Sequence, residues 1–377
     1  MLRSLSTGAV FLAVSTAAVP AAEPGGFIAG VDFSHVALFE SQGKVYRDGG
    51  RKFLQDPFAL LKDHGITCMR LRLFTSSAEQ ATKKPYDSIN NLDYTVPLAV
   101  RVKKAGLQFL LDFHYSDSWA DPGKQTKPAA WQDLSFEQLE QRMYEYNRDC
   151  IAAFKQAGAM PDFVQVGNEI TPGMVWPDGR VGGKFEKPEQ WAQLGRLMKA
   201  ASRGIKEAAG TPAPKIIVHI DRGGDWNTTK WFFDNLARQQ VEFDIIGQSY
   251  YPFWHGTLEN LRTCLTNAAR DYGKPVLVAE TAFPWIEKEW DGKPLKPIVG
   301  INPGKEGQVQ FIAELAKVVK SVPDGRGIGI FWWGTEYQPL PGTNLGGFDG
   351  RSFFDNDGNA LPALDALGKS ATWAARP

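Results

Sequence analysis

The sequence has few cysteines, no excess of charge of either sign and no long hydrophobic run beyond its first residues. The three cysteines, Cys68, Cys150 and Cys264, are scattered and odd in number, which argues against a disulfide framework or a zinc site. Buried free thiols are expected, with a Cys150–Cys264 bridge as the alternative. The 42 basic and 42 acidic residues cancel, so charge gives no reason to expect nucleic acid or an anionic membrane as a partner.

The first 22 residues are typical of a secretory signal peptide. Arg3 precedes a short apolar run at residues 8–14, and small residues at 19–22 offer a cleavage site. An uncleaved membrane anchor is the alternative, but the run is shorter than the roughly 20 residues that span a bilayer. We therefore expect secretion, to the outside of the cell or to the periplasm, and a mature chain of residues 23–377.

The rest of the chain alternates short apolar runs with amphipathic helical stretches and shows no linker. Expected strands are residues 27–33, 68–73, 108–113, 163–167, 215–220, 245–249, 275–279 and 327–332. Expected helices are 58–64, 94–105, 136–157, 188–209, 228–238, 258–272 and 305–319. Eight strands in βα order predict an α/β protein, a single-domain (β/α)8 TIM barrel. A doubly wound open sheet is less well supported, because the first βα turn lacks a Gly-x-Gly-x-x-Gly motif.

Polar and aromatic side chains follow nearly every expected strand. The carboxyl ends of barrel strands are where catalytic residues collect, so these side chains are candidate site residues. They are Asp32, Arg70, Arg72, Asp112, His114, Asp117, Trp119, Asp121, Asn168, Glu169, His219, Asp221, Tyr251, Glu280 and Trp333. Asp112 is more typical of a structural residue, and His114 fits either a buried barrel histidine or a sugar contact.

Glu169 and Glu280 end the fourth and seventh strands, which face each other across the mouth of an eight-stranded barrel. Glycoside cleavage needs two such carboxyl groups, one protonated to donate to the leaving oxygen and one ionised. Tyr251 and the two arginines, Arg70 and Arg72, are expected near Glu280, where such donors favour the ionised form. The pattern thus predicts Glu169 as acid/base and Glu280 as nucleophile.

Several longer strings carry a resemblance to a known family. Asn168-Glu169 with Glu280 resembles the retaining barrel glycosidases of clan A, and further segments resemble glycoside hydrolase family 53. These segments are residues 30–34, 43–46, 112–128, 167–170, 249–258 and 355–364. The resemblance covers nearly the whole mature chain. It implies a retaining endo-β-1,4-galactanase that cuts galactan side chains of pectin and type I arabinogalactan.

By the same resemblance, Glu169 is the acid/base, Glu280 the nucleophile, Tyr251 a hydrogen-bond donor to the nucleophile and Trp333 a sugar platform. The loop residues His114, Asp117, Trp119 and Asp121 match the family's glycone side. The chain departs from the family at Trp333-Gly334-Thr335-Glu336, where a tryptophan followed by Glu-Pro is common, and the next loop is short.

No metal and no cofactor is expected, because the histidines and acids lack a short ligand spacing. The expected partner is a β-1,4-galactan, bound by a monomer. Two other functions stay open: another clan A endoglycanase, such as a mannanase or endoglucanase, and a non-catalytic glycan-binding barrel. The second is disfavoured because binding alone does not require a pair of glutamates.

Overall fold

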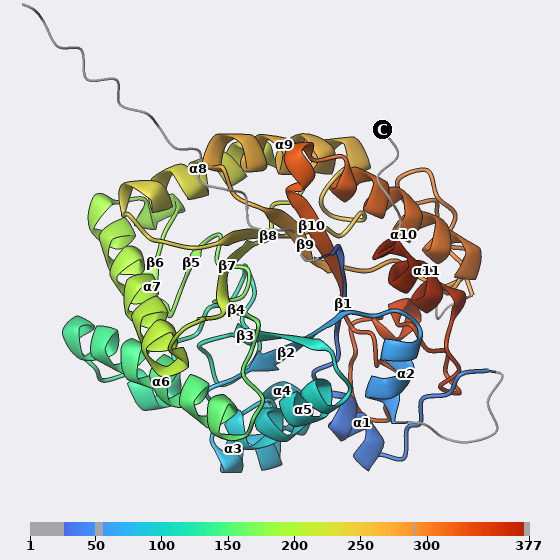
Figure 1. Cartoon of the computed structure of the whole chain (residues 1–377), viewed down its shortest axis with the longest axis horizontal. Coiled ribbons are helices and arrows are strands. Elements are labelled where there is room, and N and C mark those ends of the chain that lie inside the picture. Colours follow the sequence, from blue (N-terminus) through green and yellow to red (C-terminus); the bar gives the residue numbers. More distant parts are fainter. Residues whose placement is uncertain (1–25, 50–55, 290–291, 373–377) are drawn as a thin grey trace, which may run out of the picture.

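The computed structural model describes residues 26–49, 56–289 and 292–372, so the expected signal peptide lies outside the described residues. Eight parallel strands close into a barrel, as predicted, in the order β1-β10-β9-β8-β7-β4-β3-β2 (Figure 1). The strands are β1 (Ile28–Asp32), β2 (Cys68–Leu73), β3 (Gln108–Phe113), β4 (Phe163–Val166), β7 (Lys215–Ile220), β8 (Ile245–Ser249), β9 (Val276–Thr281) and β10 (Gly327–Trp332).

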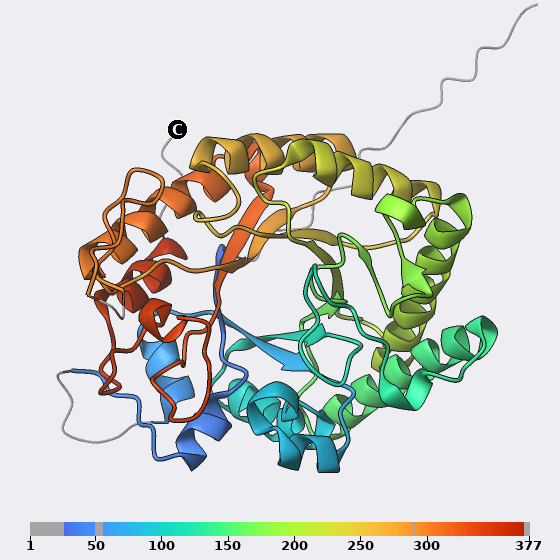
Figure 2. The same cartoon turned by 180° about the vertical axis from the view of Figure 1, so that it is seen from behind.

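A ring of helices surrounds the barrel, as both views show (Figures 1 and 2). The longer ones are α5 (Leu92–Lys104), α6 (Phe136–Gln156), α7 (Pro188–Ala209), α8 (Trp226–Arg238), α9 (Leu258–Tyr272), α10 (Lys305–Lys320) and α11 (Pro362–Ser370). The shorter ones are α1 (Val36–Ser41), α2 (Pro57–Asp63), α3 (Ala78–Lys83) and α4 (Pro85–Ser88). A capping box begins α6: Ser135 accepts from the amide of Gln138, whose side chain accepts from the amide of Ser135.

The side-chain alternation of the strands divides the core into two parts. Alternate residues such as Met69 and Leu71 of β2 pack outward in the large apolar core between strands and helices. The opposite set meets inside the barrel, where Cys68, Leu110 and Ile217 belong to a small apolar cluster. Because β2 reads Cys-Met-Arg-Leu-Arg-Leu, the inward positions after Cys68 are arginines. The barrel interior is therefore apolar at the amino ends of the strands and polar at the carboxyl ends.

Several boundaries differ from the expected ones for local reasons. Helices α5 and α8 begin two residues earlier than predicted, because Asn91 and Asp225 accept hydrogen bonds from the third residue after them and act as N-caps. Strand β9 continues to Thr281, so Glu280 lies inside a strand and not after it, next to shifts in register with both neighbours. The antiparallel pair β5 (Gly173–Met174) and β6 (Gly179–Arg180), which follows β4, was not predicted.

All three cysteines are free and buried, as expected. Across the described ranges, none of the helices combines the length and apolar character needed to cross a membrane.

Candidate active site

The two glutamates of the predicted pair stand at the carboxyl ends of β4 and β9. After β4 the chain turns through Gly167, whose φ is 91°, and Glu169 itself has a φ of 50°. A Cβ at position 167 would lie 2.5 Å from Ile170 Cγ2, so only glycine fits this turn. A non-glycine residue with left-handed φ stores strain, which is typical of residues that a site must aim.

Glu280 is buried and held by two donors. Arg70 Nη2 lies 2.8 Å from Oε1, and the hydroxyl of Tyr251 donates to Oε2 at 2.8 Å. Burial raises the pKa of Glu280, while Arg70 and the Tyr251 hydrogen bond oppose that rise. Of the three neighbours predicted for Glu280, Tyr251 and Arg70 are confirmed, whereas Arg72 pairs with Asp32 instead.

Glu169 has the opposite surroundings. Burial raises its pKa well above the usual value, and the charges of Glu280 and Asp221 raise it further. A hydrogen bond of 2.5 Å from Ser249 Oγ to Oε1 and the more distant Arg70 act against this rise. Of the two carboxyls, Glu169 is therefore the more readily protonated and Glu280 the more readily ionised, since only Glu280 is paired with a guanidinium.

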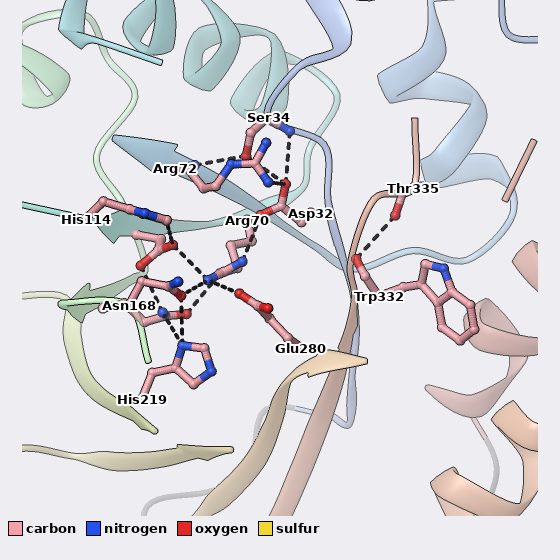
Figure 3. A network of polar contacts seen from close by, with 12 residues as sticks. Asp32, Ser34, Arg70, Arg72, His114, Asn168, His219, Glu280, Trp332 and Thr335 are labelled. Carbon is pink, nitrogen blue, oxygen red and sulfur yellow. Dashed lines mark hydrogen bonds and ion pairs between the residues drawn. The ribbon is translucent and has the colours of Figure 1, made fainter. Parts of the chain in front are cut away.

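Arg70 is the centre of a buried polar network that includes Glu280 (Figure 3). Its guanidinium makes contacts of 2.7 to 3.0 Å with five side chains: Asp32, Asp112, Gln165, Asn168 and Glu280. Although burial opposes its ionisation, Asp112 has a pKa of about 2, because Arg70 and His114 stabilise its charge. The network orients Arg70 and Asn168, and Arg70 in turn fixes Glu280.

Arg72 supports a wall of aromatic rings next to this network. It shares Asp32 with Arg70, through an Nη1–Oδ1 distance of 3.1 Å. Its guanidinium carbon lies 4.4 Å from the ring centroid of Trp119 and 5.7 Å from that of Trp333. The two tryptophan rings, with centroids 6.1 Å apart, thus present a partly exposed aromatic surface above a buried cation.

An open pocket of about 510 Å³ lies over the two glutamates. Predicted site residues form more than half of its lining: His114, Trp119, Asp121, Asn168, Glu169, Asp221, Tyr251, Glu280 and Trp333. Five others are buried and do not line it: Asp32, Arg70, Arg72, Asp112 and His219. Asp117 is apart from both sets, since its carboxylate accepts hydrogen bonds from Thr75, Gln80 and the amide of Ala129.

The histidine left open by the sequence, His114, is engaged by the protein on both ring nitrogens. Nδ1 accepts from the amide of Ala120 at 2.9 Å, and Nε2 lies 3.0 Å from Asp112. Its ring therefore faces the pocket while its nitrogens hold the β3 loop and Asp112. Asn168 uses Oδ1 for Arg70 and one N–H for the carbonyl of Ala120, which leaves its second N–H for the pocket.

Several residues of the site are not among the predicted candidates: Gln165, Arg222, Ser249, Trp254, His255, Phe348 and Glu336. The alternation of side chains along a strand could have indicated Gln165 and Ser249, since each points inward on a barrel strand near its carboxyl end. Phe348 comes from a distant loop, and its contact with Trp333, with ring centroids 4.1 Å apart, has no signal in the local sequence. Within the described ranges, no group of three or more His, Cys, Asp or Glu side chains is arranged to hold a metal ion.

The chain is similar to known proteins over most of its length. The family model for glycosyl hydrolase family 53 matches residues 28–367. The arabinogalactan endo-beta-1,4-galactanase of Thermothelomyces thermophilus is 35% identical over 347 residues, which cover 90% of this chain and 98% of that protein.

Solved structures of the same family superpose on nearly the whole chain. The GH53 catalytic domain of Ignisphaera aggregans has a TM-score of 0.81 at 34% identity and covers 92% of this chain and 96% of that one. A structure of two fungal beta-1,4-galactanases has a TM-score of 0.79 at 33% identity and covers 90% and 98%. This chain therefore belongs to glycosyl hydrolase family 53 and is a glycoside hydrolase.

Proposed function

We propose that this enzyme is a secreted, retaining endo-β-1,4-galactanase that acts on the galactan chains of type I arabinogalactan and pectin. The observation that carries the proposal is the unequal surroundings of the two glutamates. Glu280 is paired with Arg70 and Tyr251, while burial and the charges of two neighbouring acids raise the pKa of Glu169 well above its usual value. An ionised and a protonated carboxyl facing one pocket are the two groups that double displacement requires.

In the first step, a carboxylate oxygen of Glu280 attacks the anomeric carbon of the bound sugar. The bond from that carbon to the bridging oxygen breaks, and Glu169 gives its proton to this oxygen, so the leaving chain departs as an alcohol. Loss of the proton leaves Glu169 ionised, and the enzyme carries a glycosyl ester on Glu280.

In the second step, Glu169 removes a proton from a water molecule that attacks the same carbon from the side the leaving chain has vacated. The ester bond to Glu280 breaks and its carboxylate is restored beside Arg70. Two inversions at one carbon give retention. Arg70 and Tyr251 stabilise Glu280 as it leaves, which is the step that regenerates its charge.

Cleavage within a chain requires sugar contacts on both sides of the scissile bond. Trp119 and Trp333 follow β3 and β10, whereas Arg222 and Trp254 follow β7 and β8 on the other side of the barrel mouth. Trp254 is 64% exposed and lines the pocket, as a ring that stacks on sugar would. Family relatives bearing the name arabinogalactan endo-beta-1,4-galactanase support the galactan specificity. The signal-like first 22 residues support secretion.

Product analysis on linear β-1,4-galactan tests the substrate and the endo mode together. Early release of a mixture of short oligosaccharides is expected, with no comparable release from mannan or carboxymethylcellulose. Proton NMR of the first product formed should show the β-anomer before mutarotation. Activity on mannan alone would refute the substrate, and an initial α-anomer would refute retention.

A further inference from the structure

We infer that Ser249, oriented by His219, fixes which oxygen of Glu169 carries the catalytic proton. Ser249 donates its hydroxyl proton to Oε1, so the proton of Glu169 is placed on Oε2. The inference rests on the proposed function only in that Glu169 is taken as the acid. Ser249 is fully buried and is a positioning residue, because it acts on Glu169 and not on the sugar.

The orientation of the chain of hydrogen bonds starts at Arg70. An arginine only donates, so the oxygen of Gln165 is the atom 3.0 Å from Arg70 Nε, and its nitrogen is the atom on the far side. That nitrogen donates to Asp112 Oδ1 at 2.9 Å and lies 3.0 Å from Nδ1 of His219. Gln165 thus has one N–H left, and it points at His219.

The remaining N–H of Gln165 sets the tautomer of His219. Burial and Arg70 lower the pKa of His219 well below its usual value, so the ring is neutral and carries one proton. With the proton on Nε2, Nδ1 accepts from Gln165, and Nε2 donates to Ser249 Oγ at 2.9 Å. Ser249 then donates to Glu169 Oε1 at 2.5 Å. Every hydrogen in the chain has an acceptor.

The other tautomer of His219 reverses the direction of these hydrogen bonds and is less favourable. A proton on Nδ1 would bond Asn168 Oδ1, 3.1 Å away, but would also face the N–H of Gln165 at 3.0 Å. A buried N–H without an acceptor costs about 1–3 kcal/mol. Asn168 Oδ1 does not need this donor, because Arg70 Nη2 already donates to it at 2.8 Å.

The two oxygens of Glu169 therefore have different roles. Oε1 is committed to Ser249, while no hydrogen bond within the described residues reaches Oε2, on a carboxyl group that lines the pocket. The proton is therefore on the oxygen that faces the sugar. The relay is rigid, because Ser249 ends β8 in register with Glu280 and the amide of Tyr250 donates to the Glu280 carbonyl.

The test compares wild type with Ser249→Ala on aryl β-1,4-galactobiosides whose leaving groups differ in basicity. Without Ser249, the proton can sit on either oxygen and the carboxylate loses a donor. We expect kcat/KM to fall about 10-fold for a poor leaving group, a part of the total worth of general acid catalysis. For a leaving group that needs no proton, kcat/KM should stay near the wild-type value.

The pH dependence of kcat/KM distinguishes the two possible directions of the hydrogen bond between Ser249 and Glu169. Because the hydrogen bond from Ser249 stabilises ionised Glu169, its removal raises the pKa of Glu169. The alkaline limb of the kcat/KM profile should therefore move to higher pH. With the other tautomer of His219, Ser249 would accept from protonated Glu169, and its removal would move the alkaline limb to lower pH. An unchanged or downward limb, or an equal loss for both leaving groups, overturns the inference.

Controls separate this effect from general damage and from the choice of substrate. Ser370→Ala removes a buried serine in α11 whose hydroxyl, among the described residues, bonds only the carbonyl of Leu367, and it should leave the alkaline limb in place. Ser249→Cys keeps the volume and a weak donor, and should fall between wild type and Ser249→Ala. Infrared titration of the protonated carboxyl band, assigned by its loss in Glu169→Gln, needs no substrate. The band should persist to higher pH in Ser249→Ala even if the galactan proposal fails, and a band that titrates as in wild type contradicts the inference.

Discussion

At the scale of single residues, the two glutamates are chemically identical and differ only in their neighbours. Arg70 contacts Glu280 directly and reaches Glu169 only as a more distant charge. The arginine is itself fixed by acids on β1 and β3, so the difference between the glutamates originates in strands that carry neither of them.

Replacement of Glu280 by glutamine keeps the shape of the side chain and removes the nucleophile. We expect kcat/KM on galactan to fall by about 10⁴-fold or more, the scale seen when a covalent nucleophile is removed. Galactan binding, measured by calorimetry, should largely survive. Glu314→Gln, on the exposed face of α10, is the matched control and should be indistinguishable from wild type. Turnover by Glu280→Gln would show that the nucleophile is a different residue.

Trp254 allows a second test at this scale. If its exposed ring stacks on a sugar, Trp254→Ala should raise KM for galactan about 5-fold, from the loss of about 1 kcal/mol of apolar contact. The value of kcat should change little, and Trp254→Phe should retain most of the affinity. A fall in kcat at constant KM would instead place the ring among groups that act in the transition state.

The sequence predicts the members of this site better than their arrangement. Asn168, Glu169, Tyr251 and Glu280 follow from strand ends and the family resemblance, and all four line one pocket. Ser249 lies two residues before Tyr251, which was predicted as a site residue, and a serine at a strand end is not distinctive in a sequence. Its partner, Glu169, is 80 residues away, and only the closed barrel brings them together.

At the scale of elements, the long amphipathic helices α5 to α10 were predicted to within a few residues, whereas three of the four short ones were missed. α1, α3 and α4 have six, six and four residues, too few for a helical period to be recognised. α11 was also missed, although Pro362 stands at its first position, where proline favours a helix start. Its apolar face packs on β1 and α10, which the local sequence does not reveal.

The packing of α11 depends on one glycine. A Cβ at Gly368 would lie 1.8 Å from the carbonyl oxygen of His64, so Gly368→Ala must displace α11. Alanine favours helices by about 1 kcal/mol over glycine, but the overlap outweighs this gain. We expect a net loss of about 1–3 kcal/mol in the free energy of unfolding, measured in urea. Gly26→Ala, where the added carbon meets nothing within 4 Å, should change stability by less than about 0.5 kcal/mol. Equal stabilities for the two variants would contradict the close approach.

At the scale of the whole molecule, the polar half of the barrel interior makes stability depend on pH. Glu336 is fully buried beside Arg72 and Asp32, with Oε1 bonded to the amide of His35 and no partner for Oε2 among the described residues. Burial and the charge of Asp32 raise its pKa from 4.5 to about 8. Between these values the folded protein binds a proton that the unfolded chain has lost.

This difference determines how the free energy of unfolding changes with pH. Stability from Glu336 is complete below its unfolded pKa and is lost as the pH rises through its folded pKa of about 8. Glu336→Gln should therefore flatten the decline in the free energy of unfolding between about pH 5 and pH 8. Urea titrations at several pH values measure this, with Glu314→Gln as the exposed control. A decline equally steep in Glu336→Gln would show that other groups, such as Glu169, account for it.

The barrel pairs β1, which is synthesised early in translation, with β10, which is synthesised late. Ile28 is in register with Gly329, and at 5–20 residues per second a ribosome needs roughly 15–60 s to travel between them. Throughout that interval β1 has an open edge whose partner does not yet exist, and such edges are prone to pair with other chains. The yield of this enzyme in a cell should thus respond to translation speed and to factors that shield nascent chains. Its finished barrel, which has no open edge, should be indifferent to both.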